Sequence, residues 1–364
     1  MEKINKKVLI QIRDLRLGNG VATCIMNYYK HTVLQGFHID FLLNRIIDSP
    51  FMELVKQNDG EIFVLPVDTS KPCLKNLKYI NKILDNGYDI VHVNISGLNA
   101  LACLFTAYCK RIHTRIYHAH NPKENSSLKA FLRSLIYETP SVWLANTYAA
   151  CSQSAGESLF GKKNFYILRN AMDTSKYVYD SQARLNLRDQ LQIANKFVVG
   201  TVCRIAEQKN PFFTVDVFEK VIQKNRDAVL LWVGDGPLKD KLKKYIVEKN
   251  LENNVMLLGA RNDVEKLYSA MDAFLLPSKF EGLGIVFIEA QISGVECYAS
   301  QNVPTDVEIS PKIHRISLFD SKDNWANLIL SSKSDMRNEA RKYAELAGFE
   351  ISRVQDDLAN LYRK

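Results

Sequence analysis

The sequence predicts an α/β protein with two Rossmann-like domains that face each other across a cleft. Its 364 residues exceed the usual size of one hydrophobic core. Short apolar runs alternate with segments of helical period along the chain, which indicates parallel sheets covered by helices on both faces. Strand patterns lapse over 173–195, where the sequence turns polar, so we expect the chain to divide there.

The strand candidates follow one another in order along both halves. In the first half they are 8–12, 39–43, 62–65, 90–93, 115–118, 148–151 and 166–168. In the second half they are 197–202, 229–233, 255–258, 273–276 and 297–299. Ligands of such sheets bind beyond the carboxyl ends of the strands, so the functional residues are expected in the loops that follow them.

Composition and charge exclude several classes of protein. No apolar run reaches the ~20 residues of a membrane span, and seven scattered cysteines without a C-x-x-C pair argue against disulfides or zinc. We therefore expect a cytoplasmic protein. Lys and Arg minus Asp and Glu give 21 − 14 = +7 for 1–175 and 27 − 26 = +1 for 176–364. An anionic partner is expected on the first half, but no aromatic interleaving marks a nucleic-acid surface.

The stretch FEGLGIVFIEA, residues 280–290, places a glutamate near each end of an apolar helix that follows a strand. Gly282 and Gly284 permit a tight turn, and the helix N-terminus favours a phosphate. Glu281 and Glu289 would accept hydrogen bonds from hydroxyl groups, so a polyhydroxylated phosphate ester fits. An ordinary connection with one capping and one surface glutamate fits the spacing equally well.

Further motifs strengthen the first alternative. The segment 281–289 resembles the E-x7-E motif of retaining glycosyltransferases of family 4, which have the GT-B fold. The segments 20–27, 168–173, 204–210 and 233–237 resemble other motifs of that family, in the family's order. The chain is most similar to the members that build capsular polysaccharide and exopolysaccharide.

The resemblance implies an organisation of three parts. Residues 1–175 would form the acceptor-side domain, and residues 176–345 the domain that binds the nucleotide-sugar donor. Residues 346–364 would be a C-terminal helix that packs back on the first domain, as the apolar spacing of Val354, Leu358 and Leu361 permits.

The resemblance also implies roles for individual residues. Arg204 and Lys209 would neutralise the donor diphosphate, although each would also suit a surface ion pair. Glu289 would hold the ribose, and Glu281 would contact the donor sugar. The remaining donor-binding candidates are Gly20, Asn170, Gly234, Gly236, Arg261, Gly282, Leu283 and Gly284. In the glycine loop Asn19 stands where the family has glycine, so the contribution of Gly20 is the least defined.

A histidine of the first domain completes the expected catalytic set. His118 and His120 end the strand 115–118, and the resemblance places His120 near the sugar, with His118 as second choice. A buried or solvated structural histidine is the alternative. The chain contains no Asp-x-Asp, so we expect no metal ion and no cofactor.

The expected function is transfer of a sugar, with retention of configuration, from a UDP- or GDP-sugar to a saccharide or lipid-diphosphate-linked acceptor. The alternatives are a sugar-nucleotide epimerase, a phosphorylase and a non-catalytic nucleotide-binding partner subunit. Residues 110–133 carry six Lys or Arg and one acid, and apolar residues of helical period overlap them. We expect a basic amphipathic helix there that meets an anionic membrane, with an ordinary solvated helix as the alternative.

Overall fold

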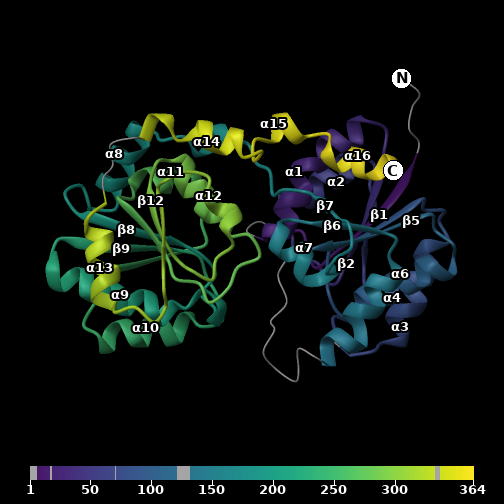
Figure 1. Ribbon diagram of the computed structural model, residues 1–364, viewed down its shortest axis with the longest axis horizontal. Coiled ribbons are helices and arrows are strands. Elements are labelled where there is room, and N and C mark those ends of the chain that lie inside the picture. Colours follow the sequence, from purple (N-terminus) through teal and green to yellow (C-terminus); the bar gives the residue numbers. More distant parts are fainter. Residues whose placement is uncertain (1–5, 17–18, 70, 121–131, 333–336) are drawn as a thin grey trace. The chain divides into compact units, whose positions relative to one another are not determined.

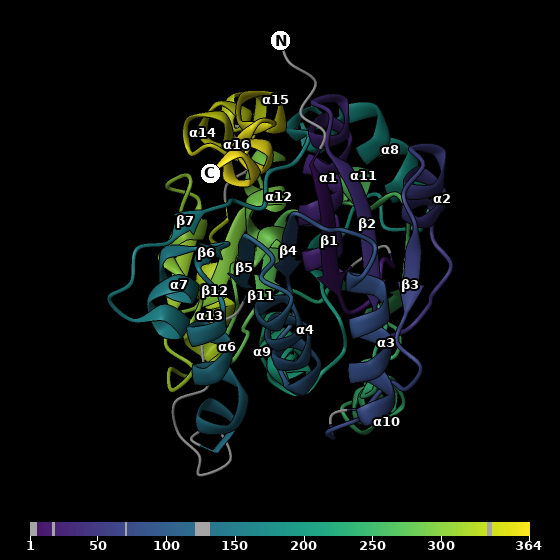
Figure 2. The same cartoon turned by 90° about the vertical axis from the view of Figure 1, so that its right-hand side faces the viewer.

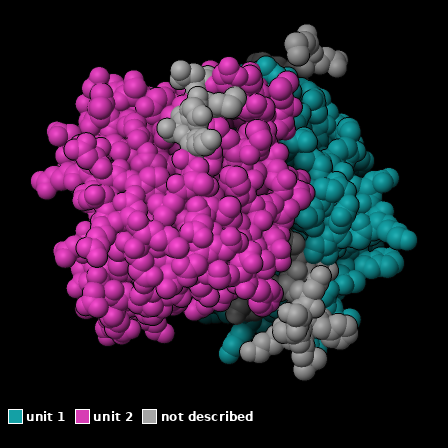
Figure 3. Space-filling model, turned by 60° about the vertical axis from the view of Figure 1, so that its left-hand side comes forward, with its two compact units in different colours: residues 1–172, 351–364 teal, residues 173–350 magenta. Residues whose placement is uncertain are grey.

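The computed structural model describes residues 6–16, 19–69, 71–120, 132–332 and 337–364. The chain forms two compact units, shown in different colours in Figure 3. Unit 1 consists of residues 1–172 with 351–364, and unit 2 of residues 173–350. The divisions fall at 172/173 and 350/351, close to the expected positions at 175/176 and 345/346.

Unit 1 is built around a parallel sheet of order β3-β2-β1-β4-β5-β6-β7 (Figure 1). Its strands are β1 (Lys7–Ile12), β2 (His38–Leu43), β3 (Ile62–Val64), β4 (Ile90–Val93), β5 (Thr114–Ala119), β6 (Thr147–Ala150) and β7 (Tyr166–Ile167). Its helices are α1 (Gly20–Leu34), α2 (Pro50–Gln57), α3 (Leu74–Leu84), α4 (Leu98–Cys109), the π-helical turn η1 (Ser134–Glu138), α6 (Thr139–Leu144), α7 (Gln153–Phe160), α15 (Ile351–Val354) and α16 (Asp357–Arg363).

The last helix completes the core of unit 1. Val8, Ile10 and Ile12 of β1 pack in one buried cluster with residues of α1 and α16. Tyr362 of α16 is fully buried, and its ring meets that of Phe37 with centroids 5.6 Å apart. The C-terminal helix therefore packs on the first domain, as expected. Helix α4 contacts both α3 and α6 on the side of the sheet away from α1 and α16 (Figures 1 and 2).

Unit 2 has a second parallel sheet, of order β10-β9-β8-β11-β12-β13. Its strands are β8 (Phe197–Val202), β9 (Ala228–Val233), β10 (Val255–Gly259), β11 (Ala273–Leu276), β12 (Glu296–Ser300) and β13 (Ile313–Ile316). Its helices are α8 (Ser181–Gln190), α9 (Pro211–Lys224), α10 (Lys239–Glu248), α11 (Val264–Ala270), α12 (Ile285–Ile292), α13 (Lys322–Leu330) and α14 (Arg341–Leu346). Short 3₁₀ turns are η2 (Thr174–Tyr177), η3 (Glu207–Lys209), η4 (Thr305–Val307) and η5 (Arg337–Glu339).

The expectation of two parallel-sheet domains is confirmed, with one strand missing from the prediction. Strand β13 lies at the edge of the sheet and pairs only with β12. Its sequence, Ile-His-Arg-Ile, places polar side chains between two isoleucines, as a half-exposed edge strand permits. Among the described residues, no helix is both long and apolar enough to span a bilayer.

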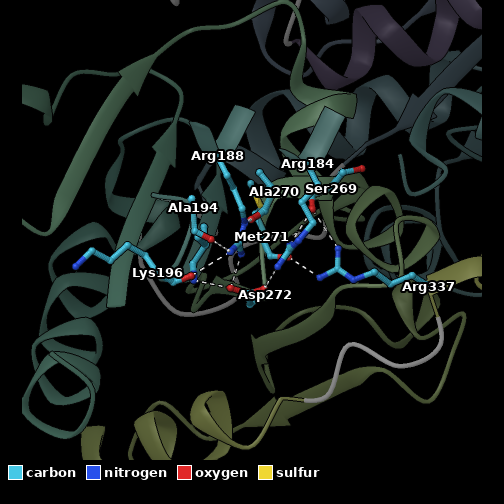
Figure 4. Close-up of polar contacts among 10 residues, drawn as sticks. Arg184, Arg188, Ala194, Lys196, Ser269, Ala270, Met271, Asp272 and Arg337 are labelled. Atoms are coloured by element: carbon cyan, nitrogen blue, oxygen red, sulfur yellow. Dashed lines mark hydrogen bonds and ion pairs between the residues drawn. The ribbon is translucent and has the colours of Figure 1, made fainter. Parts of the chain in front are cut away.

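Three arginines gather around one carboxylate at the amino end of β11 (Figure 4). Arg184 and Arg188 of α8 donate to separate oxygens of Asp272, at 2.6 Å and 2.5 Å. The backbone N–H of Val198 also donates to Asp272, at 2.8 Å. The polar helix α8 is thus fastened to two strands of the sheet.

The third arginine, Arg337, binds backbone carbonyls of the segment that precedes β11. Arg337 donates to the carbonyl oxygens of Ser269 and Met271, at 3.2 Å and 2.7 Å. Burial, together with the nearby charge of Arg184, lowers the pKa of Arg337 to about 10. Asp272 is therefore the counter-charge that makes this concentration of cations tolerable.

We expect Asp272→Ala to lower the free energy of unfolding of unit 2 by about 3–5 kcal/mol, because it leaves partly buried guanidinium groups without a counter-ion. Asp227→Ala is the control, since Asp227 pairs with Lys196 at the exposed surface and its loss should cost at most about 1 kcal/mol. Urea unfolding in a Trp143→Phe background measures both, because the remaining Trp232 and Trp325 are buried in unit 2. Equal destabilisation by the two substitutions would contradict the role of Asp272.

Candidate active site

An ion pair at the carboxyl edge of the unit 2 sheet joins two of the residues singled out from the sequence. Lys209 ends η3, which follows β8, and Glu281 lies in the loop that follows β11. The ammonium Nζ lies 2.6 Å and 2.7 Å from the two oxygens of Glu281. Ser278 donates its hydroxyl to the same carboxylate at 2.5 Å. Because Glu281 is only 3% exposed, these contacts hold a charged group in a buried position.

The loop that carries Glu281 is fixed from two neighbouring strands. Ser300, at the end of β12, donates its hydroxyl to the carbonyl oxygen of Ser278 at 2.5 Å. The side-chain amide of Gln208 donates to the carbonyl of Phe280 at 3.0 Å, and the backbone carbonyl of Gln208 accepts from the N–H of Lys279 at 2.8 Å. The carboxylate therefore has a defined position before any ligand arrives.

Helix α12 begins directly after this loop. Gly284 precedes its first residue with φ at +86°, a left-handed conformation that glycine adopts without strain. Gly284, the N-cap residue, has no side chain with which to cap the helix, and a helix N-terminus favours an anion. Gly282 and Leu283 are buried beneath the turn. Glu281, Gly282, Leu283 and Gly284 thus form one turn between β11 and α12.

Gly234 and Gly236 have a packing role in the structure. A Cβ atom at Gly234 would lie 2.0 Å from the carbonyl oxygen of Cys203, and one at Gly236 would lie 2.3 Å from that of Ile205. These glycines allow the turn after β9 to lie against the segment that carries Arg204. The Arg204 side chain is exposed, and within the described ranges no ion pair or hydrogen bond engages it.

Glu289 lies in a different environment from Glu281. It is on the second turn of α12, where the hydroxyl of Tyr268 donates to its Oε2 at 2.6 Å and Tyr177 forms a second hydrogen bond. Burial raises the pKa of Glu289, and the two tyrosine hydroxyls oppose that rise. In the part of the chain that the structure describes, no hydrogen bond joins Glu289 to Glu281, so the two carboxylates have separate partners.

Arg261, after β10, forms a two-pronged pair with Asp263. Its Nε and Nη2 lie 2.7 Å and 2.5 Å from the two carboxylate oxygens. Asp263 raises the pKa of Arg261 through these hydrogen bonds. Among the residues that the structure describes, no group of three or more His, Cys, Asp or Glu side chains is placed to hold a metal ion.

In unit 1, His120 follows β5 and is bonded to Asn94, which follows the neighbouring strand β4. The His120 Nε2 lies 2.9 Å from the Oδ1 of Asn94, and the amide Nδ2 of Asn94 points to the carbonyl of His92 at 3.4 Å. An amide oxygen only accepts, so Nε2 carries the proton and Nδ1 of His120 remains an acceptor. Asn94 thereby sets the tautomer of His120.

Two further histidines lie behind His120. The rings of His118 and His120 have centroids 4.0 Å apart. His118 Nδ1 lies 3.2 Å from Nε2 of His92, whose Nδ1 lies 2.8 Å from the hydroxyl of Tyr362 on α16. His118 is buried, so the structure supports His120, which is half-buried, as the more accessible of the two candidates.

In the described structure, no hydrogen bond joins Gly20 or Asn170, two further predicted residues of unit 1, to the three histidines. Asn19 caps α1 by accepting from the N–H of Val21 at 3.2 Å, which explains why asparagine suits a position where glycine was expected. Apart from its chain neighbours and its own helix backbone, no atom of the described residues lies within 4 Å of a Cβ placed on Gly20. The Oδ1 of Asn170 is buried and has no hydrogen-bond partner in the described structure.

Several residues that shape these sites were missed. Ser278 follows the end of β11 and Ser300 is the last residue of β12, and this position at a strand end is the signal that could have identified them. Asn94, directly after the apolar strand β4, gives a similar signal. Tyr268 gives none, because it lies in a helix 21 residues before Glu289 and only the fold brings them together.

The chain is similar to known proteins. Residues 183–347 match the family described as "Glycosyl transferases group 1". This part of the chain is a group 1 glycosyltransferase domain. It covers most of unit 2 and includes the Lys209–Glu281 pair and both ends of the predicted E-x7-E segment.

The group 1 domain is accompanied by similarity over the rest of the chain. The chain is 27% identical to EpsF of Bacillus subtilis, over 100% of this chain and 97% of that protein. It is 29% identical to the UDP-Gal:alpha-D-GlcNAc-diphosphoundecaprenol alpha-1,3-galactosyltransferase of Escherichia coli, over 82% of this chain and 81% of that protein. The crystal structure of Anabaena HepE in complex with UDP and glucose matches with a TM-score of 0.79 and 21% identity, covering 98% and 99% of the chains. These likenesses confirm the expected GT-B fold.

We expect unit 1 to lose stability as the pH falls below about 6.5. Burial lowers the pKa of His92 to about 3 and that of His118 well below 6.5. The unfolded chain therefore binds protons at pH values where the folded chain does not. The free energy of unfolding is therefore not reduced by these histidines above pH 6.5. It falls as the pH drops toward 3, with a slope of up to about 1.4 kcal/mol per pH unit for each histidine.

Hydrogen exchange of the β4 amides, corrected for the intrinsic rate at each pH, measures this slope. His92→Gln keeps a polar side chain beside Tyr362 but removes one titrating group, so its slope should be smaller. Equal slopes in the two proteins would contradict the assignment of a neutral His92.

Proposed function

We propose that the protein is a retaining hexosyl- or N-acetylhexosaminyltransferase that uses a UDP- or GDP-sugar. Its acceptor is a saccharide or a lipid-diphosphate-linked saccharide of bacterial surface-polysaccharide synthesis. The observation that carries the proposal is the Lys209–Glu281 pair beside the uncapped N-terminus of α12, inside a group 1 glycosyltransferase domain. The diphosphoundecaprenol acceptor in the name of the Escherichia coli relative supports the choice of acceptor.

The charges of the unit 2 edge suit departure of a diphosphate. Lys209 and the exposed Arg204 supply two cations, and the N-terminus of α12 adds a partial positive charge. As the bond between the sugar C1 and the diphosphate oxygen breaks, negative charge grows on the leaving phosphate, and these groups stabilise it. The leaving phosphate then takes the proton of the acceptor hydroxyl as the new bond forms on the same face. No metal ion or cofactor is required in this scheme.

The two glutamates have different tasks in this scheme. Glu281 is held in place by Lys209 and Ser278, and it accepts hydrogen bonds from hydroxyls of the transferred sugar. Glu289 already accepts from two tyrosine hydroxyls, and we assign it to the ribose. His120 of unit 1 contributes a neutral acceptor nitrogen to the sugar.

Lys209→Ala and Glu281→Ala are each expected to reduce transfer by at least about 10²-fold, because each removes a charge that acts as the glycosidic bond breaks. Release of UDP from a nucleotide sugar is measured with an undecaprenyl-diphosphate-linked N-acetylhexosamine as acceptor. Lys279→Ala is the matched control, since Lys279 lies in the same loop but pairs with Glu207 at the surface, and its activity should be unchanged. Near-normal turnover in both site variants would reject the assignment, and donor conversion without acceptor would indicate an epimerase.

A nucleotide sugar should raise the melting temperature of the protein, by an amount corresponding to about 2.7 kcal/mol at 100 times its Kd. A screen of UDP- and GDP-sugars identifies the donor, and EDTA should not alter the shift. Glu289→Gln should weaken both the free nucleotide and the nucleotide sugar. Glu281→Gln should weaken only the nucleotide sugar, because its target is the sugar.

If the two glutamate variants weakened both ligands to the same extent, the division of tasks between them would be wrong. If no nucleotide sugar shifted the melting temperature of the native protein, the donor class itself would be rejected.

A further inference from the structure

The outer helical layer of unit 1 contains a large apolar groove. It has a volume of about 740 Å³ and lies between α3, α4 and α6. Leu74 and Leu77 line it from α3, Phe105 from α4, and Trp143 from α6. Neither the donor site in unit 2 nor the histidine array uses these residues.

Apolar side chains also project from the helices around the groove. Trp143 is 82% exposed, Leu74 66% and Leu135 61%. Of fourteen large hydrophobic side chains exposed in the described structure, seven lie on α3, α4, α6 and the 132–138 segment. Such a concentration on one helical layer is uncommon for a surface that faces only water, and it marks an interaction surface.

The charges on this layer have one sign. Lys75, Lys78 and Lys82 are exposed along α3, and Lys78 lies one turn after Leu74 on the same side of the helix. Across α3, α4, α6 and the 132–138 segment the acidic residue is Glu138, and it is buried. The layer is therefore apolar and cationic, without exposed acids among its described residues.

This combination selects the occupant. A second copy of the chain, docked through the same face about a twofold axis, would bring the lysines of α3 close to one another and be opposed by their repulsion. An anionic bilayer has hydrocarbon for Trp143, Leu74 and Leu135 and phosphate for the lysines. Exposed tryptophan is also the side chain that favours the boundary between headgroups and water.

We propose that α3, α4, α6 and the 132–138 segment form the docking face of the protein on an anionic lipid bilayer. The inference rests on the proposed function in one respect, that a lipid-diphosphate-linked acceptor is held in such a bilayer. It also revises the expected basic helix over 110–133. Lys110 and Arg111 follow α4, and Arg115 belongs to β5 and donates to the carbonyl of Leu144, while 121–131 lie outside the described residues.

The test is binding of the full chain to vesicles of phosphatidylcholine with phosphatidylglycerol at low salt, measured by sedimentation. The double substitution Leu74→Ser with Trp143→Ser should reduce the partition constant for vesicle binding at least about tenfold. Phe319→Ser is the matched control, because Phe319 is 97% exposed on unit 2 and should leave binding unchanged. Lys75→Glu, Lys78→Glu and Lys82→Glu together should abolish the preference for phosphatidylglycerol over phosphatidylcholine alone.

A spectroscopic arm tests the face directly. Trp143 is exposed whereas Trp232 and Trp325 are buried, so vesicle binding should shift tryptophan emission to the blue, and Trp143→Phe should remove the shift. Unchanged binding in the Leu74 and Trp143 variant would overturn the proposal, as would native protein that fails to bind. A dimer in solution that this variant dissociates would assign the face to self-association instead.

The donor-induced rise in melting temperature, measured without vesicles, separates this inference from the proposed function. The face variants should keep the full rise, because their substitutions are in unit 1 and the donor groups are in unit 2. Loss of vesicle binding with the rise intact therefore concerns the face alone. A missing rise in the native protein would reject the donor proposal whatever the vesicles show.

Discussion

Glu281 is a charged group in a buried position, and the site in unit 2 depends on the means by which that charge is tolerated. A buried carboxylate requires a counter-charge and hydrogen bonds, and here they come from Lys209 and Ser278. Lys209 follows β8 and Ser278 follows β11, which are neighbours in a parallel sheet. Their carboxyl ends meet at one edge, and Ser300 at the end of β12 fixes the loop from the other side. Strand order is thus what assembles the site.

Other buried polar groups must also be compensated, and each is compensated in a different way. Burial raises the pKa of Glu289, and hydrogen bonds from the hydroxyls of Tyr268 and Tyr177 oppose that rise. In unit 1, His92 and His118 are tolerated because burial keeps them neutral. A charged acceptor, a hydroxyl-bonded acceptor and neutral buried rings are therefore three different solutions to the burial of a polar group in one chain.

The fold could be predicted because apolar runs of strand length alternate with helical periods, and each parallel pair needs a crossover helix. Strand β13 was not predicted, because an edge strand need not be apolar. Lys209 and Glu281 could be identified from their motifs, but their ion pair could not be predicted. The two residues are 72 positions apart, and only the order of the strands brings them together. Asn94 and Tyr268 contribute through single hydrogen bonds to residues distant in sequence, a relation that no periodicity encodes. Asn19 departed from the expected glycine because α1 needs a cap there.

The distribution of charge between the halves also acquires a physical meaning. Residues 176–364 have a net charge of 27 − 26 = +1, yet their sheet edge presents Arg204 and Lys209 to a candidate diphosphate site. Recognition of a small anion depends on charges within a few ångströms, so net charge is a poor guide to it. An extended anionic surface is different, because many exposed cations act on it together. The excess of +7 in residues 1–175 includes the lysines of α3, beside which the described helical layer has no exposed acid. The proposed donor site therefore relies on cations placed close to one small ligand, whereas the charge excess of the first half is the kind that the proposed docking face requires.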